Sequence, residues 1–532
     1  MSASSIVDAS SIRALRGSLS RAAFARQLGV TAHTVYRWEL PADAEEARRP
    51  RGDVLEKLQR LAAGVPLSRA SGGSAAEGGV LGLAPSATTP MTEDPSAVAT
   101  AFASFARFTQ GEWREAEPGL MKAVMAGADV SEDAAAIGGA GLAFAEVLLR
   151  ADARAALAAL GPALAAAARD RLTPGVSAMV YAVGALAYGL PDARFFDVGR
   201  VNAYQARVEA LAGRGATPET RLLAGIGAGW AAVVSGDHEL LVRAFDGLDQ
   251  IPVSEPPLAL ALLIDEAEAF RALIFGRPAE AVRRFEALLS RAERAGATLV
   301  AARALGSIAS RALDDLGPPE RSLALARRAL ELAREARATY GMHTVFAARA
   351  EAEALFRLGR LADARAAIAT LDTFWRETGV PPVAALSVYV RLAYLEGGHA
   401  QLVALGDKLR ACTLAGVDRL ARASAAYVDA ARVLGETRDG PTLLAAFDRA
   451  EREAGSWLFL LREIVTWRPM VFLIDPTLPR PDVALQHAQR LLDRFPSPWA
   501  SAHIRRAEGM IRATRGHVAE GRRMLKAALA TF

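Results

Sequence analysis

Residues 19–39 read LSRAAFARQLGVTAHTVYRWE, two short amphipathic patterns joined by Gly-Val-Thr at positions 29–31. Ser20 is a good N-cap for a helix over residues 21–28. The glycine of the junction suits a left-handed turn, and its threonine can cap a second helix from Ala32 to about Glu39. We therefore expect two short helices that meet at a tight turn.

Both expected helices have one apolar face, and the segments on either side of them show the same pattern. We expect the following side chains to point inward: Ile12, Leu15, Ala22, Phe24, Ala25, Leu28, Val30, Val35, Trp38, Val54, Leu55, Leu58 and Leu61. Two short helices joined in this way form a helix-turn-helix. In this arrangement Trp38 belongs to the core and is not available to stack on a base.

The order of these residues resembles the helix-turn-helix domain of the Cro and phage-repressor family, also called the XRE family. The resemblance covers residues 9–64 and implies a five-helix module that binds double-stranded DNA. It departs from the family after Glu39, where Leu40 replaces the usual glycine and Pro50 comes 11 residues after Glu39. The loop over residues 40–52 is therefore enlarged, and it either contacts the DNA backbone or is simply solvated.

The resemblance implies that the helix from Ala32 enters the major groove with its exposed side. Arg37 would reach a guanine or a phosphate, His33 and Thr34 a base edge, and Ala32 a thymine methyl group. The DNA-binding residues implied are Arg21, Thr31, Ala32, His33, Thr34, Tyr36 and Arg37, with Arg48, Arg49 and Arg51 in the enlarged loop. The alternative is that these are ordinary surface residues of a module that contacts protein.

The positive charge of the chain is concentrated at its start. The formal net charge of the 532-residue chain is +4. Residues 1–70 contain 11 Lys or Arg and seven Asp or Glu, whereas the rest of the chain contains 52 of each. The entire excess therefore lies in the first segment, which favours a polyanionic partner for that segment.

Residues 65–95 read as a flexible linker, because Pro66–Pro95 contains four prolines and five glycines without an amphipathic period. Beyond it, residues 96–532 repeat with a period of about 40 residues. Each unit places a turn glycine five residues before a small residue of the next helix. The clearest matches are GEWREA at 111–116, GRPAEA at 276–281, GRLADA at 359–364 and GHVAEG at 516–521; GPPERS at 317–322 is looser.

This repeat resembles the tetratricopeptide family, although its period is about 40 instead of 34 residues, and it is similar to repeat regions of large bacterial transcription regulators. The resemblance implies a right-handed α-solenoid of about ten helical hairpins, so the expected fold class is all-α. A solenoid of this kind has a concave groove that can hold a peptide or a protein. One tract, Ser456–Pro476, interrupts the rhythm; it is either the core of an irregular helix pair or a surface for a dimer or partner.

Several classes of protein are disfavoured by the residues themselves. The seven histidines are scattered, and neither a Gly-x-Ser-x-Gly nor a phosphate-binding Gly-Lys-Ser/Thr motif occurs, so we expect no enzyme, no catalytic residues, no metal and no cofactor. The glycine-rich GIGAGW at 225–230 is explained by close helix packing. No apolar run is long enough to span a membrane, and the single cysteine favours a cytoplasmic location.

The sequence thus predicts a DNA-binding transcriptional regulator that dimerises on a two-fold operator and senses a peptide, small molecule or protein through its solenoid. One alternative is a scaffold whose solenoid recruits partner proteins while the small module positions the assembly. Another is a repressor from a defence or mobile-element locus.

Overall fold

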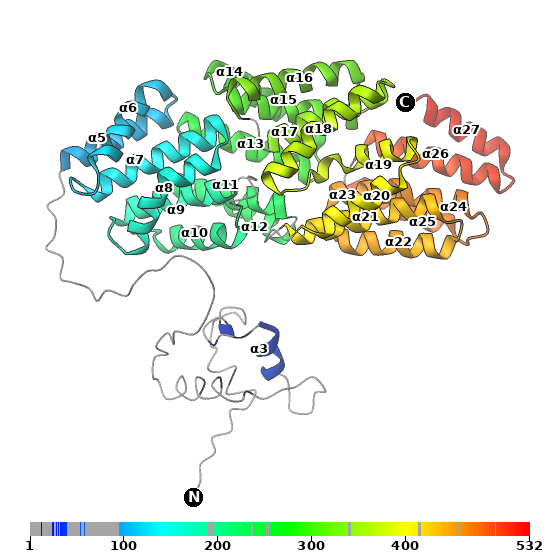
Figure 1. Cartoon of the computed structure of the whole chain (residues 1–532), viewed down its shortest axis with the longest axis horizontal. Coiled ribbons are helices and arrows are strands. Elements are labelled where there is room, and N and C mark those ends of the chain that lie inside the picture. The colour runs from blue at the N-terminus through cyan, green and yellow to red at the C-terminus, as the bar shows by residue number, and fades with distance from the viewer. Residues whose placement is uncertain are drawn as a thin grey trace, which may run out of the picture. The chain divides into compact units, whose positions relative to one another are not determined.

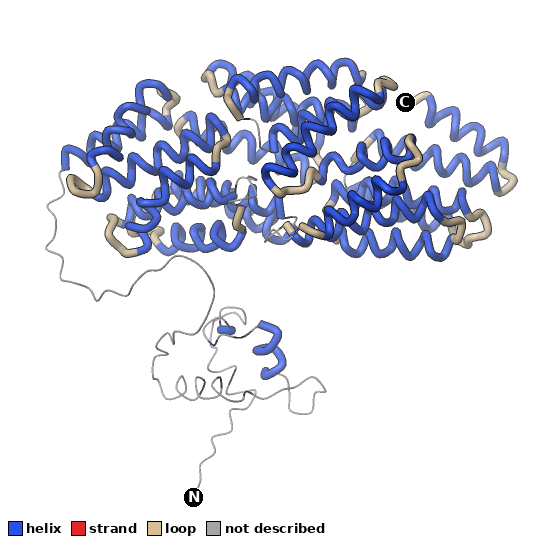
Figure 2. The backbone as a smooth tube through the Cα atoms, in the orientation of Figure 1, coloured by secondary structure: helices blue, strands red, loops and turns tan. Residues whose placement is uncertain are grey.

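The computed structural model describes residues 95–531 except 190–195, 236–237, 250, 252, 254, 339–341, 413–416, 456 and 495. Before residue 95 it describes Ile12, Phe24, Ala25, Leu28, Val30, Ala32–Glu39, Pro50, Val54 and Leu58. The chain forms two compact units, Met1–Thr89 and Pro90–Phe532, and the division falls inside the predicted linker. The described residues form helices and no strand, as Figure 2 shows, so the all-α prediction is confirmed for them.

The first unit contributes one continuous described helix, α3 (Ala32–Glu39), and the second unit contributes all the others (Figure 1). The helices of the second unit, called here the helical array, are α5 (Pro95–Thr109), α6 (Trp113–Ala126), α7 (Glu132–Ala145), η1 (Glu146–Arg150), α8 (Ala153–Ala168), α9 (Pro174–Gly189), α10 (Val198–Ala210), α11 (Pro218–Ser235), α12 (His238–Asp249), α13 (Leu258–Ile274), α14 (Pro278–Arg294), α15 (Thr298–Asp314), α16 (Pro319–Glu335), α17 (Met342–Arg357), α18 (Leu361–Thr378), η2 (Val383–Ala385), α19 (Leu386–Leu395), α20 (His399–Arg410), α21 (Asp418–Glu436), α22 (Gly440–Ala454), α23 (Leu458–Trp467), η3 (Arg468–Met470), α24 (Val471–Ile474), α25 (Pro481–Arg494), α26 (Pro498–Thr514) and α27 (Val518–Leu529).

Consecutive helices pack against each other as pairs, and the predicted turn glycines lie between the members of a pair. Four of these glycines adopt a positive φ angle, which only glycine adopts at little cost; they are Gly111, Gly276, Gly359 and Gly516. The looser match at Gly317 differs. There Leu316 takes the left-handed conformation with φ of 59°, and the glycine follows it.

The array curves back on itself, so that pairs far apart in sequence touch. The indole Nε1 of Trp113 donates a hydrogen bond to the carbonyl oxygen of Ala295, 182 residues later, at 3.1 Å. Arg311 of α15 likewise donates to the carbonyl oxygen of Pro496, 185 residues later, at 3.3 Å. The turn between α13 and α14 approaches the end of α25 so closely that a Cβ added at Gly276 would lie 2.5 Å from the Arg494 oxygen. These contacts fix the curvature of the array.

Small residues allow the closest approaches between neighbouring helices. Helices α9 and α11 touch backbone to backbone, because a Cβ on Gly227 would lie 2.7 Å from the backbone of Ala185. Gly225 of the same helix faces Leu248, where a Cβ would meet the side chain at 2.8 Å. Close packing therefore explains Gly225 and Gly227 of the GIGAGW sequence, as predicted, but not Gly229, where a Cβ would meet only the Ala244 Cβ at 4.0 Å.

The tract Ser456–Pro476 forms the core of an irregular helix pair, which is the first of the two predicted alternatives. It folds as α23, η3 and α24, and its buried apolar side chains are Leu460, Leu461, Ile464, Val465, Val471 and Phe472. Among the described residues, none of the helices combines the length and apolar character needed to cross a membrane.

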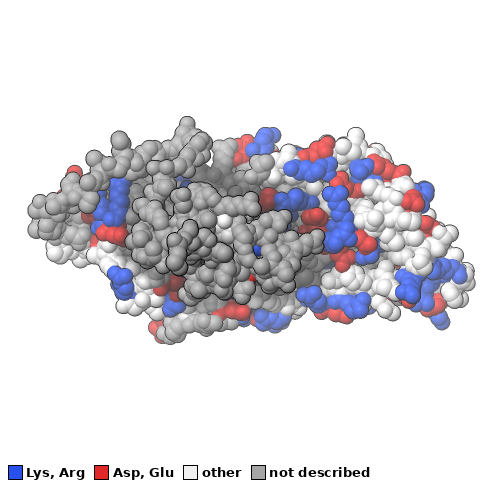
Figure 3. All heavy atoms as spheres, turned by 90° about the horizontal axis from the view of Figure 1, so that it is seen from below, with Lys and Arg blue, Asp and Glu red and all other residues white. Residues whose placement is uncertain are grey.

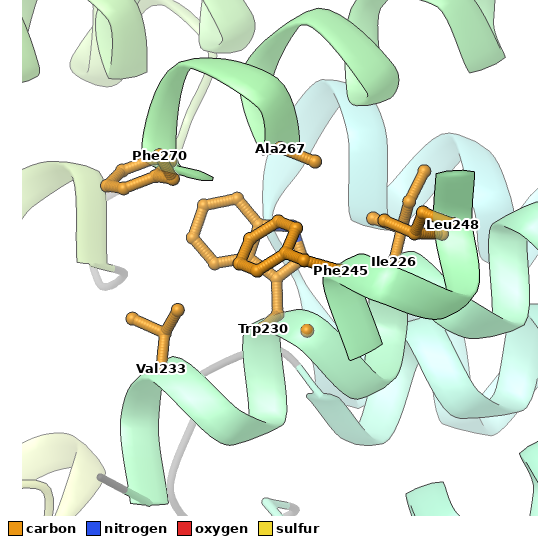
Figure 4. A pocket seen from close by; sticks show the side chains of 8 residues that line it. Ile226, Trp230, Val233, Phe245, Leu248, Ala267 and Phe270 are labelled. Atoms are coloured by element: carbon orange, nitrogen blue, oxygen red, sulfur yellow. The ribbon is translucent and has the colours of Figure 1, made fainter. Parts of the chain in front are cut away.

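A small apolar cavity lies between α11, α12 and α13, and variants beside it can test this packing. It is lined by Trp230, Phe245, Phe270 and their neighbours (Figure 4), and Gly229 lies at its edge. A Cβ added at Gly229 meets only the Ala244 Cβ, at 4.0 Å, which is ordinary van der Waals contact. The same addition two residues earlier, at Gly227, meets the backbone of α9.

We therefore expect Gly229→Ala to raise the free energy of unfolding by about 1 kcal/mol, because alanine costs less conformational entropy in a helix interior and fills part of the cavity. Gly227→Ala, on the same helix, should lower it by about 1–3 kcal/mol through forced separation of α9 and α11. Urea denaturation of both variants and the parent measures the two effects. Equal changes in the two variants would contradict this account of the packing.

Candidate functional site

The core of the first unit is built as the sequence predicts, wherever the structure describes it. The fully buried residues are Ile12, Phe24, Ala25, Leu28, Val35, Trp38 and Leu58, with Val30 and Val54 partly buried against them. Trp38 is 5% exposed and belongs to this core, as expected. Helix α3 has the predicted bounds and contributes Val35 and Trp38 to the cluster.

Helical spacing places positions 33 and 37 of α3 one turn apart, on the side opposite Val35 and Trp38. Thr34 and Arg37 are half-buried, and both interact with neighbouring groups. For Ala32, His33 and Tyr36 the structure describes the backbone alone. The remaining predicted DNA-binding residues lie outside the described residues: Arg21, Thr31, Arg48, Arg49 and Arg51.

The surface of the helical array has charges of both signs. On the face that Figure 3 shows, Lys and Arg side chains of the array lie beside Asp and Glu side chains wherever these are coloured. Many are paired within one helix, as Arg284 is with Glu280 at 2.9 Å. In the part of the chain that is described, no group of three or more His, Cys, Asp or Glu side chains is arranged to hold a metal ion.

A wide crevice lies beside α25 and α26, with room of about 480 Å³. Leu485, Ile504 and Ile511 supply its apolar residues. Its lining carries charges of both signs, with Asp482 and Glu508 beside Arg505, Arg512 and Arg515, and His517 lies among them. An apolar strip flanked by charges of both signs suits a peptide or a protein segment, since apolar side chains and polar backbone groups both find partners there.

The interior of the array holds a network of charged side chains around Asp314 of α15. Arg349 of α17 donates to one carboxylate oxygen of Asp314 at 3.1 Å, and Arg462 of α23 approaches the other at 2.9 Å. Arg311 lies 3.9 Å away on the same helix as Asp314. Although burial alone would raise the pKa of the Asp314 carboxyl, the three guanidinium groups hold it well below its usual range. The carboxylate therefore stays ionised in the core.

The network continues from Glu353, which is also buried and lies on α17. Arg391 of α19 and Arg357 approach its carboxylate at 2.7 and 2.9 Å, and these arginines offset the effect of burial and lower its pKa to about 2. The guanidinium of Arg391 also lies 4.3 Å from the ring centre of Trp499 on α26. The ring of His503 is next to that tryptophan, with 4.3 Å between ring centres. Helices α17, α19 and α26 thus meet around this second carboxylate.

No sequence pattern described above predicts this network. Arg462 and Glu463 break the apolar run of the 456–476 tract, and they are only 5% and 7% exposed. A pair of opposite charges inside an otherwise apolar tract was the available signal, because such residues are buried only when they are paired.

Compared with known protein families and with curated proteins, the chain matches no family model and no curated sequence.

The environment of His503 predicts a pH dependence of stability. Burial and the nearby charges of Arg391, Arg506 and Arg357 lower its pKa to about 3, against 6.5 in an unfolded chain. Below pH 6.5 the unfolded chain therefore binds a proton that the folded chain rejects, and stability falls with pH by up to about 1.4 kcal/mol per pH unit. The carboxylates whose pKa is lowered change the free energy of unfolding with pH only below about pH 4.5.

We expect the free energy of unfolding of the parent to fall by about 2 kcal/mol between pH 6.5 and pH 5, and we expect His503→Gln to remove most of this fall. Urea denaturation at the two pH values measures both. His517→Gln is the matched control, because His517 is exposed and its replacement should leave the slope unchanged. The explanation fails if His503→Gln and the parent lose the same stability over this range.

Proposed function

We propose that the chain is a sequence-specific DNA-binding transcriptional regulator. In this proposal the first unit is a helix-turn-helix domain that lays α3 in the major groove. The helical array is a tetratricopeptide-like α-solenoid that receives a peptide, small-molecule or protein signal and joins two chains on the DNA.

The observation that carries the proposal is the geometry of α3. Its inner residues Val35 and Trp38 share one buried cluster with Phe24 and Leu28 of the preceding segment, and this anchoring is what the proposal requires of a recognition helix. Residues 1–70, which belong to this unit, carry the whole net positive charge of the chain. A helix anchored in this way, in a segment with surplus positive charge, suits a polyanionic duplex.

The sensing role draws on the crevice beside α25 and α26. The two cavities found between inner helices of the array have only about 10 and 20 Å³ of room, which a peptide cannot enter. The crevice has a much larger volume, about 480 Å³. We therefore place signal binding at this crevice within the described residues, not in a central groove.

Dimerisation follows from the small contact area of one helix-turn-helix. A single recognition helix contacts few base pairs, and two linked modules on adjacent half-sites multiply their affinities. The operator expected for such a dimer is a pseudo-palindrome whose half-sites are about one helical turn apart.

The decisive experiment is selection of bound duplexes from a random pool, followed by affinity measurements at several salt concentrations. We expect one preferred sequence, a steep fall of affinity with salt, and a loss of tenfold or more in affinity for Arg37→Ala. Arg154→Ala removes an exposed arginine from α8 and is the matched control, which should bind like the parent.

Circular dichroism of the two variants checks that both remain folded. A chain that prefers no duplex over random competitor would overturn the proposal. The scaffold alternative would then stand, because its array binds protein and requires no DNA sequence.

A further inference from the structure

A second cavity lies inside the array where α17, α19, α21 and α23 meet. Its room of about 20 Å³ is enough for one particle the size of a water molecule or slightly larger. Arg349, Arg462 and Tyr427 line it. Phe346 and Val383 line it too, and these two residues are only half-buried, so the cavity reaches toward the surface of the array.

Three hydrogen-bond donors of this lining have no partner among the described residues. They are the Nε–H groups of Arg349 and Arg462 and the hydroxyl of Tyr427. All three residues are more than nine-tenths buried: both arginines are 5% exposed and the tyrosine is fully buried. Burial raises the pKa of Tyr427 far above its ordinary value, so its hydroxyl keeps its proton. Buried donors of this kind are costly to leave unpaired.

The charge around the cavity is not balanced. The network beside it joins five guanidinium groups to four carboxylates: Arg311, Arg349, Arg357, Arg391 and Arg462 with Asp314, Asp315, Glu353 and Glu463. One positive charge therefore remains without a counter-charge within this network. An uncompensated charge in a buried site is strongly unfavourable unless an ion of opposite sign joins it.

A water molecule can pair these donors, but it leaves the surplus charge uncompensated. The carboxylate of Glu463 also lines the cavity, and its charge is already paired with Arg462 at 3.2 Å and Arg391 at 3.5 Å. An anion needs donors only, and it also neutralises the surplus charge.

We propose that this cavity binds one small monovalent anion, of the size of chloride, held by the Nε–H groups of Arg349 and Arg462 and the hydroxyl of Tyr427. The bound anion completes the charge balance where α17, α21 and α23 meet. This site lies within the helical array and does not depend on DNA binding.

The test compares the melting temperature of the full chain in sodium chloride and in sodium gluconate, an anion too large for the cavity, at equal ionic strength. We expect chloride to raise the melting temperature by about 2 °C more than gluconate, with a dependence on concentration that saturates. Tyr427→Phe removes one of the three donors and leaves the ring in place. In gluconate, Tyr427→Phe should melt at or above the melting temperature of the parent, because the variant lacks the unpaired hydroxyl. Chloride should raise its melting temperature by less than half as much as it raises that of the parent.

Tyr389→Phe is the matched control. The Tyr389 hydroxyl donates to Asp372 at 3.0 Å, and Tyr389 is not among the residues that line the cavity, so this variant should keep the full response to chloride. Crystals grown in sodium bromide give a direct measurement, with an anomalous peak expected within hydrogen-bond distance of Arg349 and Arg462. The proposal is overturned by a parent that shows no extra stability in chloride, by an equal gain in Tyr427→Phe, or by the absence of a bromide peak.

Discussion

The carboxylate of Asp314 is the point on which the second unit depends. It accepts hydrogen bonds from Arg349, 35 residues later, and from Arg462, 148 residues later. One side chain thus joins three helix pairs in the interior. Removing one partner of a buried pair costs more than the pair contributes, since the remaining charges stay buried without compensation. The network therefore acts mainly by excluding other arrangements of α15, α17 and α23.

The curvature of the array follows from contacts of this kind. In a stack of helix pairs that touch only their sequence neighbours, the curvature is set by the small rotation between successive pairs alone. Here Trp113 bonds to Ala295 and Arg311 to Pro496, so successive parts of the array hold each other in place. The same contacts fill the interior and leave the open crevice beside α25 and α26, at the C-terminal end of the array.

Local pattern was enough to predict much of this structure, and its limits have a physical cause. The bounds of α3, the inward position of Trp38 and the left-handed turn at Gly276 follow from spacing and backbone preference, which a sequence displays directly. The salt bridge of Arg462 with Asp314 cannot be predicted in this way. Periodicity shows that a residue lies near the core, but it does not show which residue is its partner. The turn of the looser match at Gly317 differs for a related reason: the residue with the positive φ angle is Leu316, one position before the glycine that the repeat pattern displays.

The division of charge decides what each unit can contribute under the proposed function. The chain beyond residue 70 carries equal numbers of basic and acidic residues, and the side chains of the array are extensively paired. It therefore offers phosphate groups little net attraction, because the fields of paired charges cancel within about a Debye length. Attraction to DNA must come from the first unit, while the array contributes by holding two such units together. A signal that alters the array would then change affinity through the spacing of two modules and not through the charge that either presents.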